Sequence, residues 1–240
     1  MRYLFQNVHK SRKTVHDLLD SRQNSTDIIF IQEAPINFIR KVPNATNPEV
    51  DDLKGPVHHK AWQCIDRRLM FDDSVVAIYL NKCIMITHQA IVNDSAVIHK
   101  DVLIVQVTNN KLKNMDFTLV NVYNRPGAGN KAISSLLQAV PAITNIAVVQ
   151  GDFNLHSPLW DERISRGSGL ATELFNTLSD CSLNLVNDEG DPTWTNGKGA
   201  SSVIDLLFCN DRLVALDPLL DVSLDDRGRS DHALISFTFG

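Results

Sequence analysis

Short apolar runs rich in β-branched residues recur along this chain, and they constrain its fold more than any other feature. Such runs are too short for core helices and are typical of strands buried in a sheet. They lie at residues 2–8, 27–32, 75–80, 83–92, 102–108, 116–123 and 146–150. Most of the chain from residue 183 to residue 239 is also predicted to form short strands. We therefore expect a protein built mainly from β-sheet.

Helical spacing of apolar residues is confined to a few segments. These segments are residues 11–22, where Ser11 suits the N-cap position, 131–139 and 168–180. Many strands and few helices predict two packed sheets with the helices outside. The runs at 102–108 and 116–123 flank the polar turn NNKLKN and are expected to pair as a hairpin. Residues 43–60 are rich in Pro, Asn and Asp and are expected to form a long surface loop.

The composition sets limits on the class of protein. A chain of 240 residues fits one large domain, here taken as residues 1–240, that needs no disulfide or structural metal. The net charge of −5 argues against a general nucleic-acid coat but allows an enzyme that gathers acidic residues around a metal. The four cysteines contain no CxxC pair, which favours thiols in a reducing compartment. No apolar run approaches the ~20 residues of a membrane span, so no membrane partner is expected.

The strongest local signal is the segment Gly151-Asp152-Phe153-Asn154, which directly follows the apolar run at 146–150. Glycine ends a strand and lets the backbone approach a ligand closely. In extended backbone, Asp152 and Asn154 point to the same side and bring a carboxylate and an amide to the mouth of the sheet. Such a pair can hold water or a phosphate oxygen. Taken alone, an Asx-rich turn is the commoner outcome for such a segment.

Other polar residues also stand at the ends of apolar runs. Glu33 ends the run at 27–32, where a lone carboxylate is usually solvated but would suit Mg²⁺ as a hard oxygen ligand. Asn7 ends the first run and Tyr123 ends the run at 116–123. An amide and a phenol both suit a phosphate oxygen because they donate hydrogen bonds without adding negative charge.

The segment Ser230-Asp231-His232 precedes the closing strand of the chain. His232 is the natural general base because a neutral imidazole is available near pH 7, although a capping or packing histidine is more common. Such a histidine needs a carboxylate to orient its ring. Asp205 is the candidate, because a carboxylate inside the apolar run SVIDLLF is costly unless it is paired.

Taken in order, these segments resemble the endonuclease/exonuclease/phosphatase superfamily over almost the whole chain. The matching residues are Asn7, Glu33, Tyr123, Asp152, Asn154, Asp205, Asp231 and His232. Finer detail resembles the endonuclease domains of non-LTR retrotransposons, in GDFNLHSPLWD and in TWTNGKGASSVIDLLF. We interpret the tryptophans of these two segments, Trp160 and Trp194, as packing residues. Abasic-site repair enzymes of the superfamily typically carry Asp two residues after the first-strand Asn, where this chain has His9, which argues against a repair role.

The resemblance implies a four-layer α/β sandwich of two mostly antiparallel sheets. It implies Mg²⁺ or Mn²⁺ held chiefly by Glu33, with Asn7 and Asp231 beside the metal. His232, oriented by Asp205, would activate or position water, and Asp152 would donate a proton or orient the nucleophile and leaving group. Asn7, Tyr123 and Asn154 would grip the scissile phosphate.

The implied substrate is double-stranded DNA, nicked to leave a 3′-hydroxyl that can prime reverse transcription. The resemblance further implies a nuclear, monomeric domain that precedes a reverse transcriptase in a larger polyprotein. Because the chain is acidic overall, DNA contacts must come from local residues. The candidates are Lys10, Arg125, Asn196 and Lys198. For most such residues a solvated face is the commoner role, but the Gly-rich loop of Lys198 should overhang the site and enter a groove.

Other functions remain open at this point. One alternative is an abasic-site repair endonuclease or a superfamily phosphatase that acts on a small molecule. Another is a nucleic-acid-binding module whose catalytic site has decayed. The intact set of Glu33, Asp152, Asn154, Asp205 and His232 argues against decay, because a binding module does not need this set at its strand ends.

Overall fold

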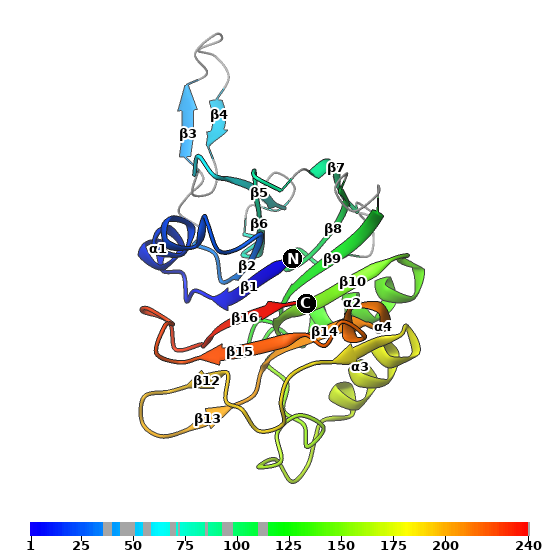
Figure 1. The fold of residues 1–240 in the computed structure, drawn as a ribbon. Helices are drawn as coiled ribbons and strands as arrows, with labels where there is room; N and C mark the ends of the chain where they lie inside the picture. Colours follow the sequence, from blue (N-terminus) through cyan, green and yellow to red (C-terminus); the bar gives the residue numbers. More distant parts are fainter. Residues whose placement is uncertain are drawn as a thin grey trace.

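The computed structural model describes residues 1–35, 40–43, 51–54, 59–67, 71, 73–84, 86–92, 98–109 and 115–239. Two six-stranded sheets form the centre of the molecule (Figure 1). The first sheet has the order β15 (Leu219–Ser223), β16 (Leu234–Thr238), β1 (Arg2–Asn7), β2 (Ile28–Gln32), β6 (Ala77–Asn81), β5 (Trp62–Asp66). The second has the order β11 (Leu183–Leu185), β14 (Asp205–Asn210), β10 (Ile146–Asp152), β9 (Met115–Tyr123), β8 (Val102–Asn109), β7 (Ile86–Ile91).

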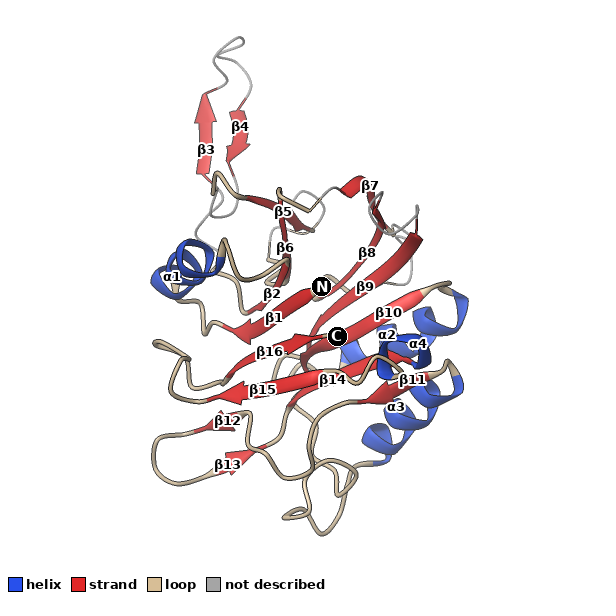
Figure 2. Ribbon diagram, viewed as in Figure 1, coloured by secondary structure: helices blue, strands red, loops and turns tan. Residues whose placement is uncertain are grey.

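The three longest helices lie on the outer faces of the two sheets (Figure 2). α1 (Arg12–Arg22) buries Val15, Leu18 and Leu19 against the first sheet, and the Ser11 side chain caps it by accepting a hydrogen bond from the Thr14 N–H. Two longer helices cover the second sheet, and two short ones complete the set. These are α2 (Lys131–Ala139), α3 (Gly169–Asp180), η3 (Val140–Ala142) and α4 (Asp211–Val214).

A third apolar cluster fills the space between the sheets. It joins residues of the first sheet such as Phe5 and Phe30 to residues of the second such as Leu119 and Leu207. The order of layers is therefore helix, sheet, sheet, helix, which confirms the predicted four-layer α/β sandwich. Each sheet contains one parallel pair, β1 with β2 and β9 with β10, and is otherwise antiparallel as expected.

Some sequence predictions were wrong or incomplete. The loop expected at residues 43–60 contains β4 (Asp51–Lys54), which pairs with β3 (Arg40–Pro43); residues 44–50 and 55–58 lie outside the described part. β5 was not predicted, because Gln63 and Asp66 interrupt its apolar residues at the edge of the first sheet. The hairpin of β8 and β9 is confirmed, although residues 110–114 of its turn lie outside the described part.

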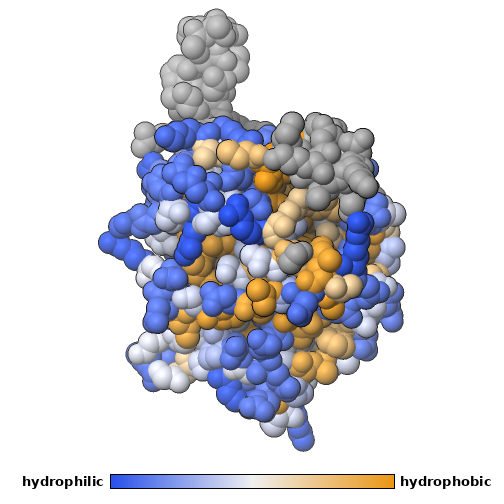
Figure 3. Space-filling view, in the orientation of Figure 1, coloured by the Kyte–Doolittle hydropathy of each residue, from blue (hydrophilic) through white to orange (hydrophobic). Residues whose placement is uncertain are grey.

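The face of the molecule drawn in Figure 3 carries both polar and apolar side chains. Figure 3 shows hydrophilic side chains over α1 and apolar side chains near the two chain ends, where Met1, Tyr3, Leu213 and Phe239 help to line a pocket of about 370 Å³. No disulfide joins the four cysteines, which all lie in the described part of the chain. Among the described residues, no helix has the length and apolar character to cross a membrane.

Candidate active site

Strand direction brings polar side chains from both sheets to one end of the sandwich. The parallel strands β1, β2, β9 and β10 all end there. The antiparallel strands β14 and β16 begin where their neighbours β10 and β1 end. The side chains delivered to this end are Asn7, Glu33, Tyr123, Asp152, Asp205 and His232. The structure therefore brings together residues that are far apart in the sequence.

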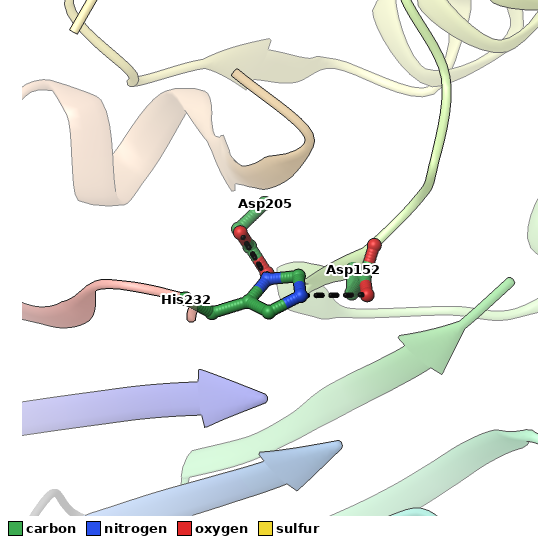
Figure 4. Close-up of side chains that lie close together, drawn as sticks. All are labelled: Asp152, Asp205 and His232. Atoms are coloured by element: carbon green, nitrogen blue, oxygen red, sulfur yellow. Dashed lines mark hydrogen bonds and ion pairs between the residues drawn. The ribbon is translucent and has the colours of Figure 1, made fainter. Parts of the chain in front are cut away.

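His232 lies between two buried carboxylates, as Figure 4 shows. Its Nδ1 is 2.9 Å from Asp205 Oδ2, and its Nε2 is 3.8 Å from Asp152 Oδ2. Asp205 and Asp152 are each 1% exposed and His232 is 5% exposed. Asp205 therefore occupies the ring-orienting position that was predicted for it, and the free ring nitrogen faces Asp152.

These surroundings change the protonation of the imidazole. Burial alone would lower the pKa of His232, but Asp205, Asp152 and Asp231 together raise the pKa to about 9. Burial, and then the charge of Asp205, raise the pKa of Asp152 to about 8. The prediction of a neutral imidazole near pH 7 therefore fails for the metal-free protein, because it assumed the ordinary pKa of histidine.

The segment after β10 differs in detail from its prediction. Asn154 has a φ of +48° instead of extended backbone, and its N–H donates to Asp152 Oδ1 at 3.1 Å, as in an Asx turn. The Asn154 side chain donates to the Asn124 carbonyl at 2.9 Å. A β-carbon at Gly151 would overlap the Val122 carbonyl oxygen, so this glycine allows close approach of the neighbouring strand instead of a ligand.

Glu33 leaves β2 with a φ of +47°, a strained conformation for a residue with a side chain. Its Oε1 accepts hydrogen bonds from the Tyr123 hydroxyl at 2.8 Å and from Asn7 Nδ2 at 3.1 Å. Burial, and then the charge and hydrogen bond of Glu33, raise the pKa of Tyr123, so the phenol keeps its proton. The second oxygen, Oε2, is 4.0 Å from the Nζ of the exposed Lys10 side chain.

Asn7 links the acidic groups of the two sheets. Its Nδ2 also donates to Asp152 Oδ2 at 2.8 Å, while its Oδ1 accepts from the His9 N–H at 2.9 Å. The orientation of the amide is therefore fixed by its partners. Asn7 acts as a bridge between Glu33 and Asp152, and its predicted role as a metal ligand stays a prediction.

Asp231 lies at the rim of the cluster. Its Oδ2 accepts from Trp194 Nε1 at 2.9 Å. Its Oδ1 has no hydrogen-bond partner in the described residues and lies 3.5 Å from His9 Nδ1 and 4.0 Å from His232 Nε2. A solvent-shielded carboxylate oxygen with no donor is suited to a cation.

Two residues that sequence reasoning did not select hold the acidic segments in place. Thr193 Oγ1 accepts from the Ile204 and Asp205 N–H groups, both at 3.0 Å. Ser230 Oγ donates to the Asn7 carbonyl at 2.5 Å and accepts from the His232 N–H. Ser230 directly precedes the predicted residues Asp231 and His232, which is the signal that could have identified it, whereas Thr193 lies twelve positions before Asp205 and has no comparable signal.

The tryptophans differ from their prediction in one case. Trp160 is 1% exposed within the outer core of the second sheet, as expected for a packing residue. Trp194 is only half-buried, and it donates its indole N–H to Asp231. The interpretation of Trp194 as a packing residue was therefore incomplete.

The predicted DNA-contacting residues have different environments. Arg125 donates from Nε and Nη2 to the buried carboxylate of Asp101. This ion pair neutralises the guanidinium charge within the protein. Asn196 accepts from the Lys198 and Ala200 N–H groups and shapes the exposed turn between β12 (Trp194–Thr195) and β13 (Ser201–Ser202). Lys10 is exposed beside Glu33. Their role in binding DNA stays a prediction.

Among the described residues, one group of side chains has the geometry to hold a metal ion, and two further carboxylate oxygens lack hydrogen-bond donors. Asp152, Asp205 and His232 offer ligand atoms within 4.8 Å of one another. Both oxygens of Asp205 lie within 3.2 Å of His232 Nδ1, however, so this set is already engaged as an ion pair. Glu33 Oε2 and Asp231 Oδ1 are the available hard oxygen donors. Carboxylate oxygens are hard donors of the kind that Mg²⁺ and Mn²⁺ prefer.

The sandwich and this cluster define a member of the endonuclease/exonuclease/phosphatase superfamily, whose members are nucleases and other phosphodiesterases. The family model described as endonuclease-reverse transcriptase matches residues 117–236. The chain belongs to this endonuclease–reverse transcriptase family. No curated protein matches the sequence of the chain.

Solved structures with low sequence identity share the fold. The endonuclease domain of TRAS1, a telomere-specific non-LTR retrotransposon, has a TM-score of 0.71 at 17% identity, over 99% of this chain and 97% of that one. The 3′-5′ exonuclease NExo from Neisseria meningitidis has a TM-score of 0.63 at 18% identity, over 100% and 99%. The catalytic domain of Xenopus laevis APE2 has a TM-score of 0.62 at 16% identity, over 100% and 91%.

Proposed function

We propose that this protein is a Mg²⁺-dependent DNA endonuclease that nicks target DNA and leaves a 3′-hydroxyl for target-primed reverse transcription. One observation carries the proposal: the Asp205–His232 pair faces Asp152, and Asn7 joins Asp152 to Glu33 across the two sheets. The structural similarity to the TRAS1 endonuclease domain, over nearly all of both chains, supports the retrotransposon role.

DNA as the substrate is supported by the structural neighbours. A Neisseria NExo structure holds a product DNA hairpin, and a D. rerio TDP2 structure holds a single-stranded DNA product. These share the fold with this chain at 18% and 14% identity. These neighbours support DNA as the kind of substrate. They do not indicate which DNA sequence or structure is cut.

The residues of the site divide the chemistry among them. His232, kept protonated by the carboxylates around it, donates from Nε2 to a phosphoryl oxygen on which negative charge grows. The ionised form of Asp152, favoured when a cation is bound nearby, would orient the attacking water and accept its proton, while Asp205 fixes the imidazole. The Tyr123 hydroxyl and the Asn7 amide are donors toward the scissile phosphate.

A divalent cation completes this site. Glu33 and Asp231 would hold it through the oxygens that receive no hydrogen bond from the described residues, with Asn7 between Glu33 and the Asp152 carboxylate. When bound, the ion neutralises charge on the phosphoryl and leaving-group oxygens. Lys10, 4.0 Å from Glu33, is then free to turn toward the DNA backbone.

A comparison of substrates tests the proposal. Initial rates in Mg²⁺ are measured on intact supercoiled plasmid, on a duplex with one abasic site and on a small phosphomonoester. We expect nicking of the intact plasmid, with no strong preference for the abasic duplex and no phosphatase turnover. Cleavage confined to the abasic site, or release of phosphate alone, would instead support the repair or phosphatase alternatives. Binding of DNA without turnover in any assay would support a decayed module.

A further inference from the structure

A layer of buried amides lies directly beneath the candidate active site. It consists of Gln32 of β2, Asn121 of β9 and Gln150 of β10, each 0% exposed. Each amide precedes a site residue on the same chain segment by one or two positions. The site residues concerned are Glu33, Tyr123 and Asp152. Because strand side chains repeat every two residues, Asn121 and Gln150 face the same side as Tyr123 and Asp152, one step deeper.

These amides hydrogen-bond across the space between the two sheets. Gln32 Nε2, from the first sheet, donates to Asn121 Oδ1 at 2.6 Å and to Gln150 Oε1 at 3.2 Å, both in the second. In return, Asn121 Nδ2 donates to the carbonyls of Ile31 and Ala77 in the first sheet, at 3.0 and 2.9 Å. Gln150 Nε2 also donates to Asn121 Oδ1 at 2.8 Å. Asn121 is therefore the centre of the network.

Stability alone does not require amides at these positions. Burial of an amide is costly unless it is hydrogen-bonded, and the rest of the space between the sheets is filled by apolar side chains. Apolar packing is also tolerant of sliding, whereas hydrogen bonds fix both distance and direction. A polar layer at this depth fixes the spacing and register of the two sheets.

The site above this layer depends on that spacing. The Tyr123 hydroxyl reaches Glu33 across the two sheets at 2.8 Å, and Asn7 reaches Asp152 across them at 2.8 Å. Glu33 and Asn7 come from the first sheet and its strand ends, whereas Tyr123 and Asp152 come from the second sheet. A shift of about 1 Å between reacting groups can cost on the order of 10²-fold in rate.

We propose that Gln32, Asn121 and Gln150 are positioning residues that hold the two halves of the active site at their working distance. The consequence for rate rests on the proposed nuclease function, but the consequence for the Tyr123–Glu33 contact does not. Activity and geometry are therefore measured separately.

The central variant is Asn121→Leu, and Asn81→Leu is its matched control. Asn81 is a buried amide of β6, 4% exposed, whose Nδ2 also donates to two carbonyls, those of Gln23 and Thr26, at 2.8 and 2.9 Å. It lies at the opposite end of the first sheet, since Leu80 pairs with Ile28 at the start of β2. Both variants lose one buried amide, its two hydrogen bonds to carbonyls and the hydrogen bonds that its Oδ1 accepts, which are two for Asn121 and one, from the Cys83 N–H, for Asn81.

The geometric readout is the ¹³Cζ resonance of Tyr123, which reports the hydrogen bond of its hydroxyl. The chain has three tyrosines, so Tyr123→Phe assigns the signal. The kinetic readout is kcat and KM for plasmid nicking, at a temperature well below the unfolding midpoint of each variant. For Asn121→Leu we expect a shifted Tyr123 signal and a kcat roughly 10–100-fold lower, with KM changed by less than about twofold. For Asn81→Leu we expect a similar loss of stability with an unchanged signal and kcat.

Equal kcat values for the two variants, or an unmoved Tyr123 signal in Asn121→Leu, would overturn the positioning role. If Asn121→Leu does not fold, the near-isosteric Gln32→Met is measured by the same two criteria. If the wild-type protein does not nick DNA, the proposed function fails, and the Tyr123 signal alone still decides the positioning role.

Discussion

His232 is held between Asp205 and Asp152 in surroundings almost closed to solvent. Burial alone would lower the pKa of the imidazole, but Asp205 Oδ2 at 2.9 Å, together with Asp152 and Asp231, outweighs burial and raises the pKa to about 9. Such an ion pair contributes to folding as well as to chemistry, because the folded protein binds this proton more tightly than the unfolded chain does.

The pH dependence of stability follows from that difference in pKa. His232 has a raised folded pKa, so its contribution is fully present below about pH 6.5 and is lost as the pH rises through about 9. The raised pKa of Asp152 also makes the free energy of unfolding fall as the pH rises, over a range that begins at lower pH and ends near 8. In EDTA, we expect the contribution of His232 to the free energy of unfolding to fall by at most about 3 kcal/mol as the pH rises from about 6.5 to about 9.

Urea unfolding at several pH values measures this decline, and Asp205→Asn is the informative variant. Removal of the Asp205 charge lowers the pKa of both His232 and Asp152, so the stability of the variant should depend less on pH. Equal pH dependence in the wild type and in Asp205→Asn would show that this ion pair does not control the proton.

At the scale of elements, the hairpin of β12 and β13 is joined to the site at its base. Trp194 Nε1 donates to Asp231 Oδ2, the Thr195 N–H donates to the Asp231 carbonyl at 3.0 Å, and Arg227 donates to Thr195 Oγ1 at 2.7 Å. The hairpin projects from the same end of the molecule as the carboxyl end of β1 (Figure 1). If this hairpin contacts DNA as predicted, the same segment would also orient a candidate metal ligand.

Trp194→Phe tests this connection. Loss of the indole N–H frees Asp231 to rotate, so we expect the Mg²⁺ concentration for half-maximal nicking to rise several-fold, with little change in stability. Trp62→Phe is the matched control, because Trp62 Nε1 donates to the Leu19 carbonyl, away from the site. A Mg²⁺ titration in which both variants behave alike would count against the connection.

The turn between β12 and β13 is the part of the hairpin that is predicted to enter a groove of the DNA. Gly197 and Gly199 adopt positive φ values of +70° and +97°, and Lys198 between them is exposed. If this turn senses the width of a groove, a shortened turn should redistribute the nicks along a DNA fragment while the total rate changes less. Sequencing of the nicked ends measures the distribution, and unchanged positions would exclude this role.

Sequence reasoning succeeds where one residue carries the signal. Glu33, Asp152 and Asp205 stand out because each is a carboxylate beside or within an apolar run, and all of them reach one site. It fails where the environment is set by distant residues. Neither the pairing of Arg125 with Asp101 nor the raised pKa of His232 can be predicted from local sequence, because the partners are brought in by the fold.

The buried amides show a signal that was present but not used. Gln32, Asn121 and Gln150 each interrupt or end an otherwise apolar strand, in FIQEA, LVNVY and VVQGD. A single amide in such a strand is easily taken as the end of the strand. Only the pairing of the sheets shows that the three amides meet one another.

For the whole molecule, the sandwich shows how an acidic chain could act on DNA, as we propose. The net charge of −5 is not spread evenly, since part of it is drawn into one site of buried carboxylates. Asp152 and Asp205 share the charge of His232, and Glu33 Oε2 is left to a cation and to Lys10. Neutralisation of these carboxylates would lower the electrostatic barrier to a phosphate backbone at this end of the molecule.

Nicking of supercoiled plasmid by the wild type, Glu33→Ala and His232→Ala, with Mg²⁺ or with EDTA, tests the central claim most directly. We predict nicks with extendable 3′-hydroxyl ends for the wild type in Mg²⁺ and none in EDTA. His232→Ala should lose on the order of 10²–10⁴-fold in rate, and both variants should keep the wild-type fold by circular dichroism. His156→Ala, an exposed histidine just beyond Asn154, is the control. Wild-type rates in either site variant, or nicking that persists in EDTA, would contradict the assignment of this site.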